Sequence, residues 1–239
     1  MNGYQMKGQL NSNKLIAVSG VKGSGKDSVA SMLQYCLSVP KMFRQYFFYK
    51  YFRKWVKPKY KKLAFADPLK KMLAVLLNIP VEEFNNRNFK EFCTVHIPTL
   101  NFNDDTNNKL PDSKFNKLVK TLDPSLAEGY LSIRQLMQYF GTEVMQTHFG
   151  RKVWINSTLR HGSSKGTIIA DLRFKAEAEA VQSLGGFIVY VSRPGYTFGQ
   201  HASEKEMSEL LSDNKYDFII ENDGTQEDLF NKVKTLCND

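Results

Sequence analysis

Short runs of consecutive apolar residues recur along the chain, and each has the length of a β-strand. They lie at 15–19, 63–66, 167–170, 187–192 and 217–221. Because the apolar residues are continuous instead of alternating with polar ones, the pattern is typical of strands covered on both faces. The sequence therefore predicts five buried strands.

Segments with apolar residues at helical spacing lie between these runs. The spacing of three and four residues predicts helices within 29–37, 69–77, 133–144 and 176–184. Gly185-Gly186 is expected to end the fourth helix with a left-handed cap, and Thr225 to begin a last helix. Since strands and helices alternate, we expect an α/β fold with a five-stranded parallel sheet flanked by helices.

Two segments interrupt this alternation, at about 39–62 and 78–130, and the second is rich in Asn, Asp and Pro. A chain of 239 residues is long enough for one elaborated domain. We therefore interpret residues 1–239 as a single domain, with both segments as helical insertions at the edge of the sheet.

The positive charge is concentrated in the first insertion. Lys and Arg number 33 against 24 Asp and Glu, a formal net charge of +9. Nine basic residues and no acidic one lie between Lys41 and Lys62, so the other 24 basic residues balance the 24 acidic ones. The positive field of this segment is expected to attract anions.

Aromatic residues interleave with these charges, and four recur at every fourth position: Phe43, Phe47, Tyr51 and Trp55. We interpret this stripe as the face of an inserted helix that packs on the protein body while the lysines face solvent. Similar compositions occur in segments that bind nucleic acid or an anionic membrane surface. Contact of 41–62 with nucleic acid or a replication complex is therefore the less favoured alternative.

The cysteines and the apolar runs bear on the cellular compartment. Cys36, Cys93 and Cys237 are odd in number and form no CxxC pair, which argues against a disulfide framework and a zinc site. No run approaches the roughly 18 apolar residues of a membrane span, and residues 1–14 lack the apolar core of a signal peptide. We expect a cytoplasmic protein with no membrane association.

A glycine-rich turn follows the first apolar run and precedes a helical segment. It has the GxxxxGK pattern of a P-loop, in which backbone N–H groups converge on phosphates and the lysine reaches the β- and γ-phosphates. The pattern predicts binding of a nucleoside triphosphate, ATP, by Gly20, Val21, Lys22, Gly23, Ser24, Gly25, Lys26, Asp27 and Ser28.

Two acidic residues are candidate Mg²⁺ ligands. Asp27 stands where Ser or Thr usually follows the loop lysine, and a carboxylate can ligate Mg²⁺ directly or through water. We assign the metal to Asp27 and keep Ser28 as the second candidate. Asp171 follows the apolar run 167–170, as an acidic residue that holds the same ion through water would. A helix cap is the less favoured alternative for Asp171 alone, and the presence of the P-loop weakens that alternative further.

A GTPase is the less suitable interpretation of the loop. Asn214 to Asp217 matches the guanine-reading NKxD pattern. The match precedes a predicted strand instead of following one, and no DxxG follows the loop at a switch-like position. We interpret the match as accidental.

Arginines are expected around a migrating phosphoryl group because they neutralise its charge. Arg134, Arg151, Arg173 and Arg193 are the candidates, and Arg173 and Arg193 each follow a predicted strand closely, where sites of parallel sheets lie. Asp67 follows the second strand in the same way. It is expected to cap the next helix or to contact an acceptor.

These motifs resemble those of the bacteriophage deoxynucleoside monophosphate kinases, P-loop kinases related in fold to adenylate kinase. The resemblance covers most of the chain, and 41–62 lies outside it. It rests on Ser19–Asp27, Ala64–Lys70, Ser132–Glu143 followed by Trp154, Asp171–Arg173, Val191–Gly195, His201–Glu204 and Ile220–Gly224. It implies ATP-dependent phosphorylation of deoxynucleoside 5′-monophosphates to diphosphates in the cytoplasm of an infected cell, with Mg²⁺ accompanying ATP.

The resemblance also implies roles for single residues. The catalytic group would be Lys26, Arg134, Asp171 and Arg173, with Mg²⁺ on Asp27 and Asp171 and with Arg193 beside ATP. His201 to Glu204 would lie on a mobile segment. Apart from the resemblance, we expect the two insertions to form a lid or acceptor-binding region. Gly23 stands where some members carry a basic residue. The acceptor would contact Asp67, Lys70, Arg134, Arg151, Arg173 and Glu204.

Two alternatives stay open. Animal-type phosphomevalonate kinases share the Gly-Lys-Asp loop, although the stretch Ser132–Glu143 favours the nucleotide enzyme. A nucleic-acid-binding P-loop protein would have 41–62 as its functional centre. Base preference and oligomeric state, a homodimer included, are not determined by the sequence.

Overall fold

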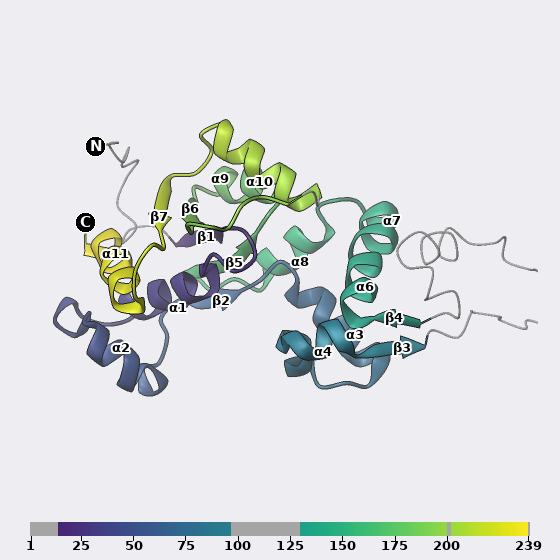
Figure 1. The fold of residues 1–239 in the computed structure, drawn as a ribbon, viewed down its shortest axis with the longest axis horizontal. Coiled ribbons are helices and arrows are strands. Elements are labelled where there is room, and N and C mark those ends of the chain that lie inside the picture. Colours follow the sequence, from purple (N-terminus) through teal and green to yellow (C-terminus); the bar gives the residue numbers. More distant parts are fainter. Residues whose placement is uncertain (1–13, 97–129, 200–201, 239) are drawn as a thin grey trace, which may run out of the picture. The chain divides into compact units, whose positions relative to one another are not determined.

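A computed structural model describes residues 14–96, 130–199 and 202–238 (Figure 1). The chain divides into two compact units, one formed by 1–67 with 151–239 and the other by 68–150. None of the helices in the described ranges combines the length and the apolar character needed to cross a bilayer.

The first unit is built on a five-stranded parallel sheet, as predicted. Its strands are β1 (Leu15–Ser19), β2 (Lys61–Leu63), β5 (Thr167–Leu172), β6 (Phe187–Ser192) and β7 (Phe218–Glu221). Their order across the sheet is β2-β5-β1-β6-β7, and every neighbouring pair is parallel. The strand that leads into the glycine-rich loop is therefore the central one.

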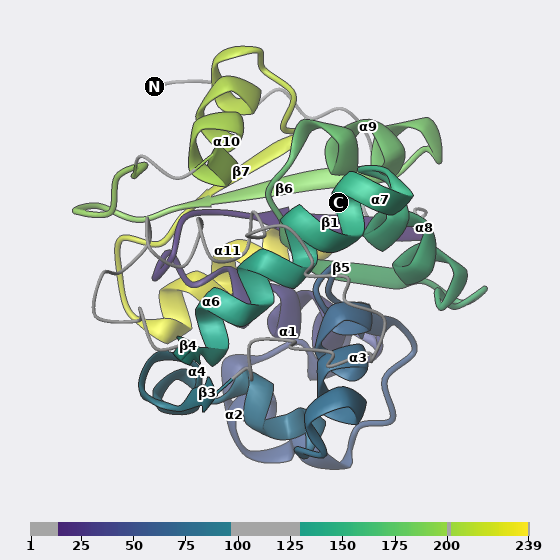
Figure 2. The same ribbon diagram turned by 90° about the vertical axis from the view of Figure 1, so that its right-hand side faces the viewer.

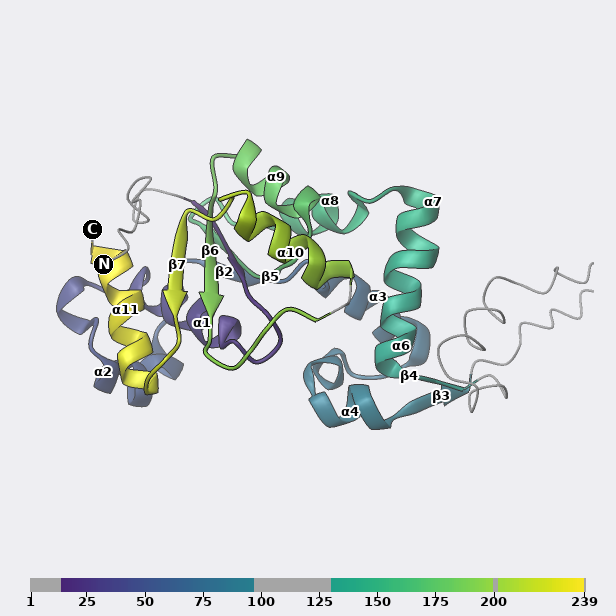
Figure 3. The same ribbon diagram turned by 45° about the horizontal axis from the view of Figure 1, so that its top comes forward.

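Helices cover both faces of this sheet (Figures 1 and 3). Alternate side chains of β1 enter two separate cores, because successive residues of a strand point to opposite faces. Ile16 and Val18 pack with α1 (Lys26–Cys36) and α11 (Gln226–Asn238). Ala17 belongs to the opposite core, formed with α8 (Val153–Arg160), α9 (Lys175–Ser183) and α10 (Ala202–Ser212).

The boundaries of β2 correct the sequence prediction of a strand at 63–66. The strand ends at Leu63, and the next residues form a turn. Their N–H groups bond to side chains instead of to a neighbouring strand: Ala64 donates to Asp67, and Phe65 and Ala66 donate to Asp171. The carboxylates thus replace the ladder hydrogen bonds that an extended strand would have made.

The first insertion packs on α1 and α11, but through other rings than the predicted stripe. It contains short turns at Lys41–Phe43 and Arg53–Trp55 on either side of α2 (Tyr46–Phe52). The buried ring is Tyr49, which stacks on Phe230 of α11 at a centroid distance of 5.2 Å. The prediction that Phe43, Phe47, Tyr51 and Trp55 pack on the body is wrong, since all four are exposed.

The second unit is mainly helical (Figure 2). Its helices are α3 (Asp67–Leu77), α4 (Arg87–Phe92), α6 (Ile133–Gln138) and α7 (Thr147–Phe149). The first residue of α3, Asp67, still belongs to the first unit. A 3-10 turn lies at Val81–Asn85 and a π-helical stretch at Tyr139–Gln146. A two-stranded antiparallel sheet joins β3 (Thr94–His96) and β4 (Tyr130–Ser132). Most of the predicted insertion at 78–130 lies outside the described residues.

We expect Phe230→Ala to lower the free energy of unfolding by about 3–5 kcal/mol, because it opens a cavity under Tyr49 in the first core. Phe230 is 0% exposed and packs against three tyrosines. Urea unfolding measures the change. Leu184→Ala is the control, since Leu184 is 61% exposed, and equal losses in both variants would contradict this assignment of the core.

Candidate active site

The glycine-rich loop connects β1 to α1, and α1 begins at the lysine of the motif. The residue before it, Gly25, has a φ of +96°. A Cβ built on Gly25 would stand 2.6 Å from the side-chain nitrogen of Asn222, so both the backbone angle and the space require glycine. The N-terminus of α1 therefore opens on the loop, an arrangement that favours anions.

Lys26 is almost buried, with 8% of its surface exposed. Burial lowers the pKa of its ammonium group, and the positive charge of Arg173 lowers it further. The carboxylates of Asp27, Asp171 and Glu204 act in the opposite direction. The charges that act on Lys26 thus come from α1, the end of β5 and α10, and they comprise one cation and three carboxylates.

Asp171 fixes the backbone next to this point. One of its oxygens accepts the N–H of Phe65 at 2.6 Å, and the other accepts the N–H of Ala66 at 3.2 Å. Asp67 closes the same turn by accepting the N–H of Ala64 at 2.8 Å. The turn after β2 and the carboxyl end of β5 are therefore held together by carboxylates.

Glu177 is a buried acidic residue that the sequence pattern did not single out. It lies in the first turn of α9 and accepts the N–H groups of Arg173 at 2.7 Å and Phe174 at 3.1 Å. Burial, and then the charge of Asp171, raise the pKa of Glu177 to about 8. A glutamate at the third helical position is a capping signature that could have identified it.

On the other side of the loop, Arg193 follows β6. Its Nη1 donates to the carbonyl oxygen of Gly23 at 3.1 Å, and its guanidinium lies 5.0 Å from the ring centroid of Tyr196. Gly23 has a φ of +88°, and a Cβ there would lie 2.4 Å from the Tyr196 ring. A basic residue at position 23 would therefore have to displace the Tyr196 ring. No sequence motif indicated that Tyr196 lies beside the P-loop.

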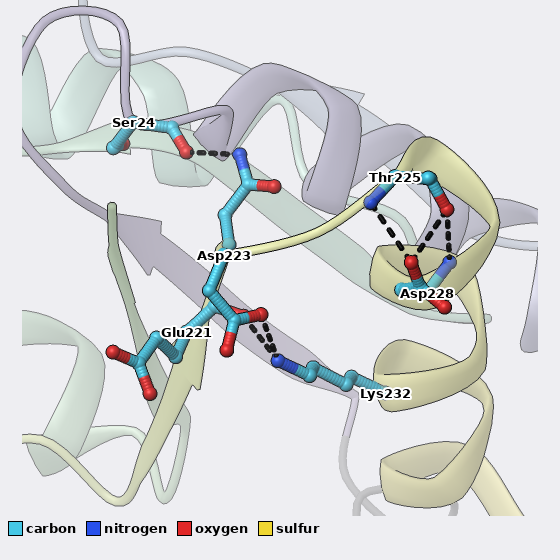
Figure 4. Close-up of polar contacts among 7 residues, drawn as sticks. Ser24, Glu221, Asp223, Thr225, Asp228 and Lys232 are labelled. Atoms are coloured by element: carbon cyan, nitrogen blue, oxygen red, sulfur yellow. Dashed lines mark hydrogen bonds and ion pairs between the residues drawn. The ribbon is translucent and has the colours of Figure 1, made fainter. Parts of the chain in front are cut away.

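The loop after β7 contacts the P-loop as well. Asn222 donates from Nδ2 to the carbonyl oxygen of Ser24 at 2.8 Å, and Lys232 of α11 bonds to Asp223 and to the carbonyl oxygen of Glu221 (Figure 4). Asn222 lies within the motif at 220–224, but its partner is 198 residues away, so the sequence did not indicate the contact.

The remaining candidates are Arg151, Arg134, Lys70, Glu204 and His201. Arg151 is exposed just before α8. Within the second unit, Arg134 forms an ion pair with Glu91 at 2.9 Å and Lys70 donates to Asn85 at 3.0 Å. Glu204 lies in the first turn of α10 and accepts the N–H of Gly199, whereas His201 lies outside the described residues. The structure thus gathers Lys26, Asp27, Asp171, Arg173 and Glu204, with Asp67 and Arg193 on the adjoining turns.

Comparison with known families shows to which family the chain belongs. The family model described as deoxynucleotide monophosphate kinase matches residues 87–233. The chain is a member of the deoxynucleotide monophosphate kinase family. The match extends over Asp171, Arg173, Arg193 and Glu204, and the P-loop lies before it.

Individual relatives agree with this membership. A putative deoxynucleotide monophosphate kinase of Acanthamoeba polyphaga mimivirus is 24% identical over 226 residues, covering 92% of this chain and 93% of that protein. The deoxynucleotide monophosphate kinases of Enterobacteria phage T4 and Escherichia phage RB69 are 29% and 30% identical, over 56% and 44% of both chains. The chain thus aligns with about half the length of the phage kinases.

Among solved structures, a dephospho-CoA kinase from Campylobacter jejuni matches at 13% identity, with a TM-score of 0.36, over 94% of this chain and 96% of that one.

The buried carboxyl of Glu177 predicts a pH dependence of stability. Between pH 4.5 and about 8 the folded protein holds a proton that the unfolded chain has released, so stability falls as pH rises through this window. Glu177→Gln keeps an oxygen acceptor for both N–H groups and does not ionise. We expect the free energy of unfolding of Glu177→Gln, relative to that of the wild type, to increase as pH rises from 5 to 8.

Urea unfolding without nucleotide or divalent cation measures this difference. Glu179→Gln, at an exposed position of the same helix, is the control and should follow the wild-type curve. Parallel pH curves for Glu177→Gln and the wild type would contradict the burial of an ionisable carboxyl.

Proposed function

We propose that this chain transfers the γ-phosphoryl group of ATP to a deoxynucleoside 5′-monophosphate at the P-loop of its first unit. The observation that carries the proposal is the buried ammonium of Lys26 at the start of α1, beside Arg173 and three carboxylates, in a member of the deoxynucleotide monophosphate kinase family. The viral origin of its relatives supports action in the cytoplasm of an infected cell.

The sheet order suggests how the two nucleotides divide the site. The P-loop follows the central strand, with Arg193 and Asn222 at the ends of β6 and β7 and with Asp67 and Asp171 at the ends of β2 and β5. Ligands of parallel sheets lie outside the carboxyl ends of the strands. We assign ATP to Gly20–Ser28 with Arg193, and the acceptor to the β2–β5 side.

We place the acceptor on the β2–β5 side because the chain leaves the first unit after β2. Residues 68–150 follow the turn after β2 directly, and they contain two further cations proposed for the acceptor, Lys70 and Arg134. Arg151, Arg173 and Glu204 of the first unit are also proposed for the acceptor. In Arg134 the buried Nε has no hydrogen-bond partner among the described residues, although Nη2 is paired with Glu91.

The chemistry requires positioning and charge neutralisation. A phosphate monoester has a second pKa near ~6, so at pH 7 the acceptor is mostly a dianion that attacks without a general base. Lys26 and Arg173 would neutralise the charge on the transferring group. Binding of both nucleotides in one closed site would also keep water from competing as the acceptor.

Asp27 and Asp171 are residues that fit a Mg²⁺ ion. Asp27 and Asp171 both act electrostatically on Lys26, and hard carboxylate oxygens are the ligands that Mg²⁺ prefers, with water and nucleotide phosphates completing its shell. The ion, when bound with ATP, neutralises phosphate charge. Asp171 would serve it while also holding the turn at 65–66.

We expect Lys26→Ala to lower the rate of phosphoryl transfer by more than about a hundredfold, since it removes a buried, preorganised positive charge. Formation of ADP and of the deoxynucleoside diphosphate from Mg·ATP and each of the common deoxynucleoside monophosphates measures the rate. Lys165→Ala, at an exposed position, is the control. Near-normal turnover by folded Lys26→Ala protein would contradict the proposed role.

We expect Asp27→Asn and Asp171→Asn each to raise the Mg²⁺ concentration needed for half-maximal rate, because each removes one negative charge from the metal side. A magnesium titration of kinase activity at saturating ATP tests this, with Glu179→Gln as the control. Unchanged requirements in both variants would contradict the assignment. A shift in Ser28→Ala but not in Asp27→Asn would move the direct contact to Ser28.

A further inference from the structure

The first insertion exposes a contiguous set of aromatic rings. Phe47 is 58% exposed, Tyr51 53%, Phe52 42% and Trp55 76%. The rings contact one another, with centroid distances of 5.0 Å between Phe47 and Tyr51, 6.0 Å between Phe47 and Phe52, and 5.5 Å between Phe52 and Trp55. We call these four residues the aromatic patch.

The patch is held firmly although its own rings face solvent. Tyr49 of the same helix is buried against Phe230, and buried Arg44 donates to the carbonyl oxygen of Cys237 at 2.7 Å. Figure 1 shows α2 beside α11. The exposed rings are therefore presented on an anchored element, and contiguous exposed apolar surface of this kind usually marks an interaction site.

Cations surround the patch. Lys50, Arg53 and Lys54 are exposed and lie between its members in the sequence, and the Nζ of Lys50 is 5.3 Å from the Tyr51 ring centroid. No acidic residue occurs from 41 to 62. A partner must therefore be an anion that also offers flat apolar surfaces.

A polar groove runs beside the patch, between α1 and the insertion. It encloses about 520 Å³ and is lined by three cationic side chains, Arg53, Lys54 and Lys62, against one carboxylate, Asp27. Its other lining includes five residues that carry hydroxyl groups, Ser28, Ser31, Tyr35, Ser38 and Tyr49. Cationic and hydroxyl groups together suit phosphate oxygens.

We propose that the aromatic patch and this groove bind single-stranded nucleic acid, with bases stacked on the patch and backbone phosphates on Arg53, Lys54 and Lys62. Aromatic platforms combined with a basic groove bind single strands with little sequence preference, because every base has a π-face. The argument does not rest on the kinase activity, since none of the rings of the patch and none of these three cations belongs to the proposed catalytic group. The groove nevertheless shares Asp27 and Ser28 with the proposed ATP site.

Charge and shape favour single-stranded nucleic acid over a membrane surface or a protein as the ligand of the patch. A membrane-surface helix separates an apolar face from a charged face, whereas here three cations and three rings are interspersed along the exposed run 50–55, and α2 has only seven residues. The centres of protein–protein interfaces are depleted in lysine, whereas this insertion is rich in it. Both features favour a polyanion with exposed bases.

Fluorescence anisotropy of a labelled oligothymidylate of about 20 nucleotides tests the proposal, with an oligouridylate, a duplex and phosphatidylserine vesicles as parallel probes. We expect salt-sensitive binding of the single strands. Trp55→Ala should weaken it by about five- to hundredfold, the loss of one stacked base, without changing kinase activity. Phe92→Ala is the matched control, because Phe92 is an 80% exposed ring of the second unit.

Removing charge gives a second readout. If Arg53 and Lys54 each neutralise one phosphate, Arg53→Gln or Lys54→Gln should make the plot of log affinity against log salt shallower by about 0.7, whereas Lys165→Gln should leave the slope unchanged. Absence of single-strand binding at low salt would overturn the proposal. So would equal affinity for the duplex, or binding to vesicles but not to oligonucleotides.

Discussion

The site depends on one buried ammonium group. Removing a cation from water is costly unless neighbouring charges and dipoles compensate, and Lys26 is 8% exposed. The compensation comes from the negative charges of Asp27, Asp171 and Glu204, which belong to three separate elements and raise the pKa of Lys26. Since α1 begins at Lys26 itself, the lysine stands where the glycine-rich loop passes into the helix.

Side-chain hydrogen bonds hold the loops at the carboxyl end of the sheet. Asp171 binds the turn after β2, Glu177 binds the backbone of Arg173, and Asn222 binds the P-loop at Ser24. Each contact is a short polar side chain accepting from, or donating to, a backbone group that no strand pairs. The loops of five parallel strands are thus joined around one point, where the negative charge of nucleotide phosphates would be neutralised.

The local parts of this arrangement can be predicted from the sequence, and the long-range parts cannot. The P-loop and the five strands follow from spacing within a few residues. The predicted end of β2 is wrong because its turn is held by Asp171, 106 residues from Phe65. The predicted orientation of α2 is wrong because aromatic residues occupy all of its faces, so periodicity alone does not select Tyr49 as the ring that meets Phe230.

The most direct test of the account is transfer of label from [γ-³²P]ATP to each deoxynucleoside monophosphate, with the products separated by chromatography. The account predicts labelled deoxynucleoside diphosphate formed in equal amount to ADP, and little ADP without an acceptor. Release of inorganic phosphate alone, or label transfer to phosphomevalonate but to no nucleotide from folded, ATP-binding protein, would contradict it.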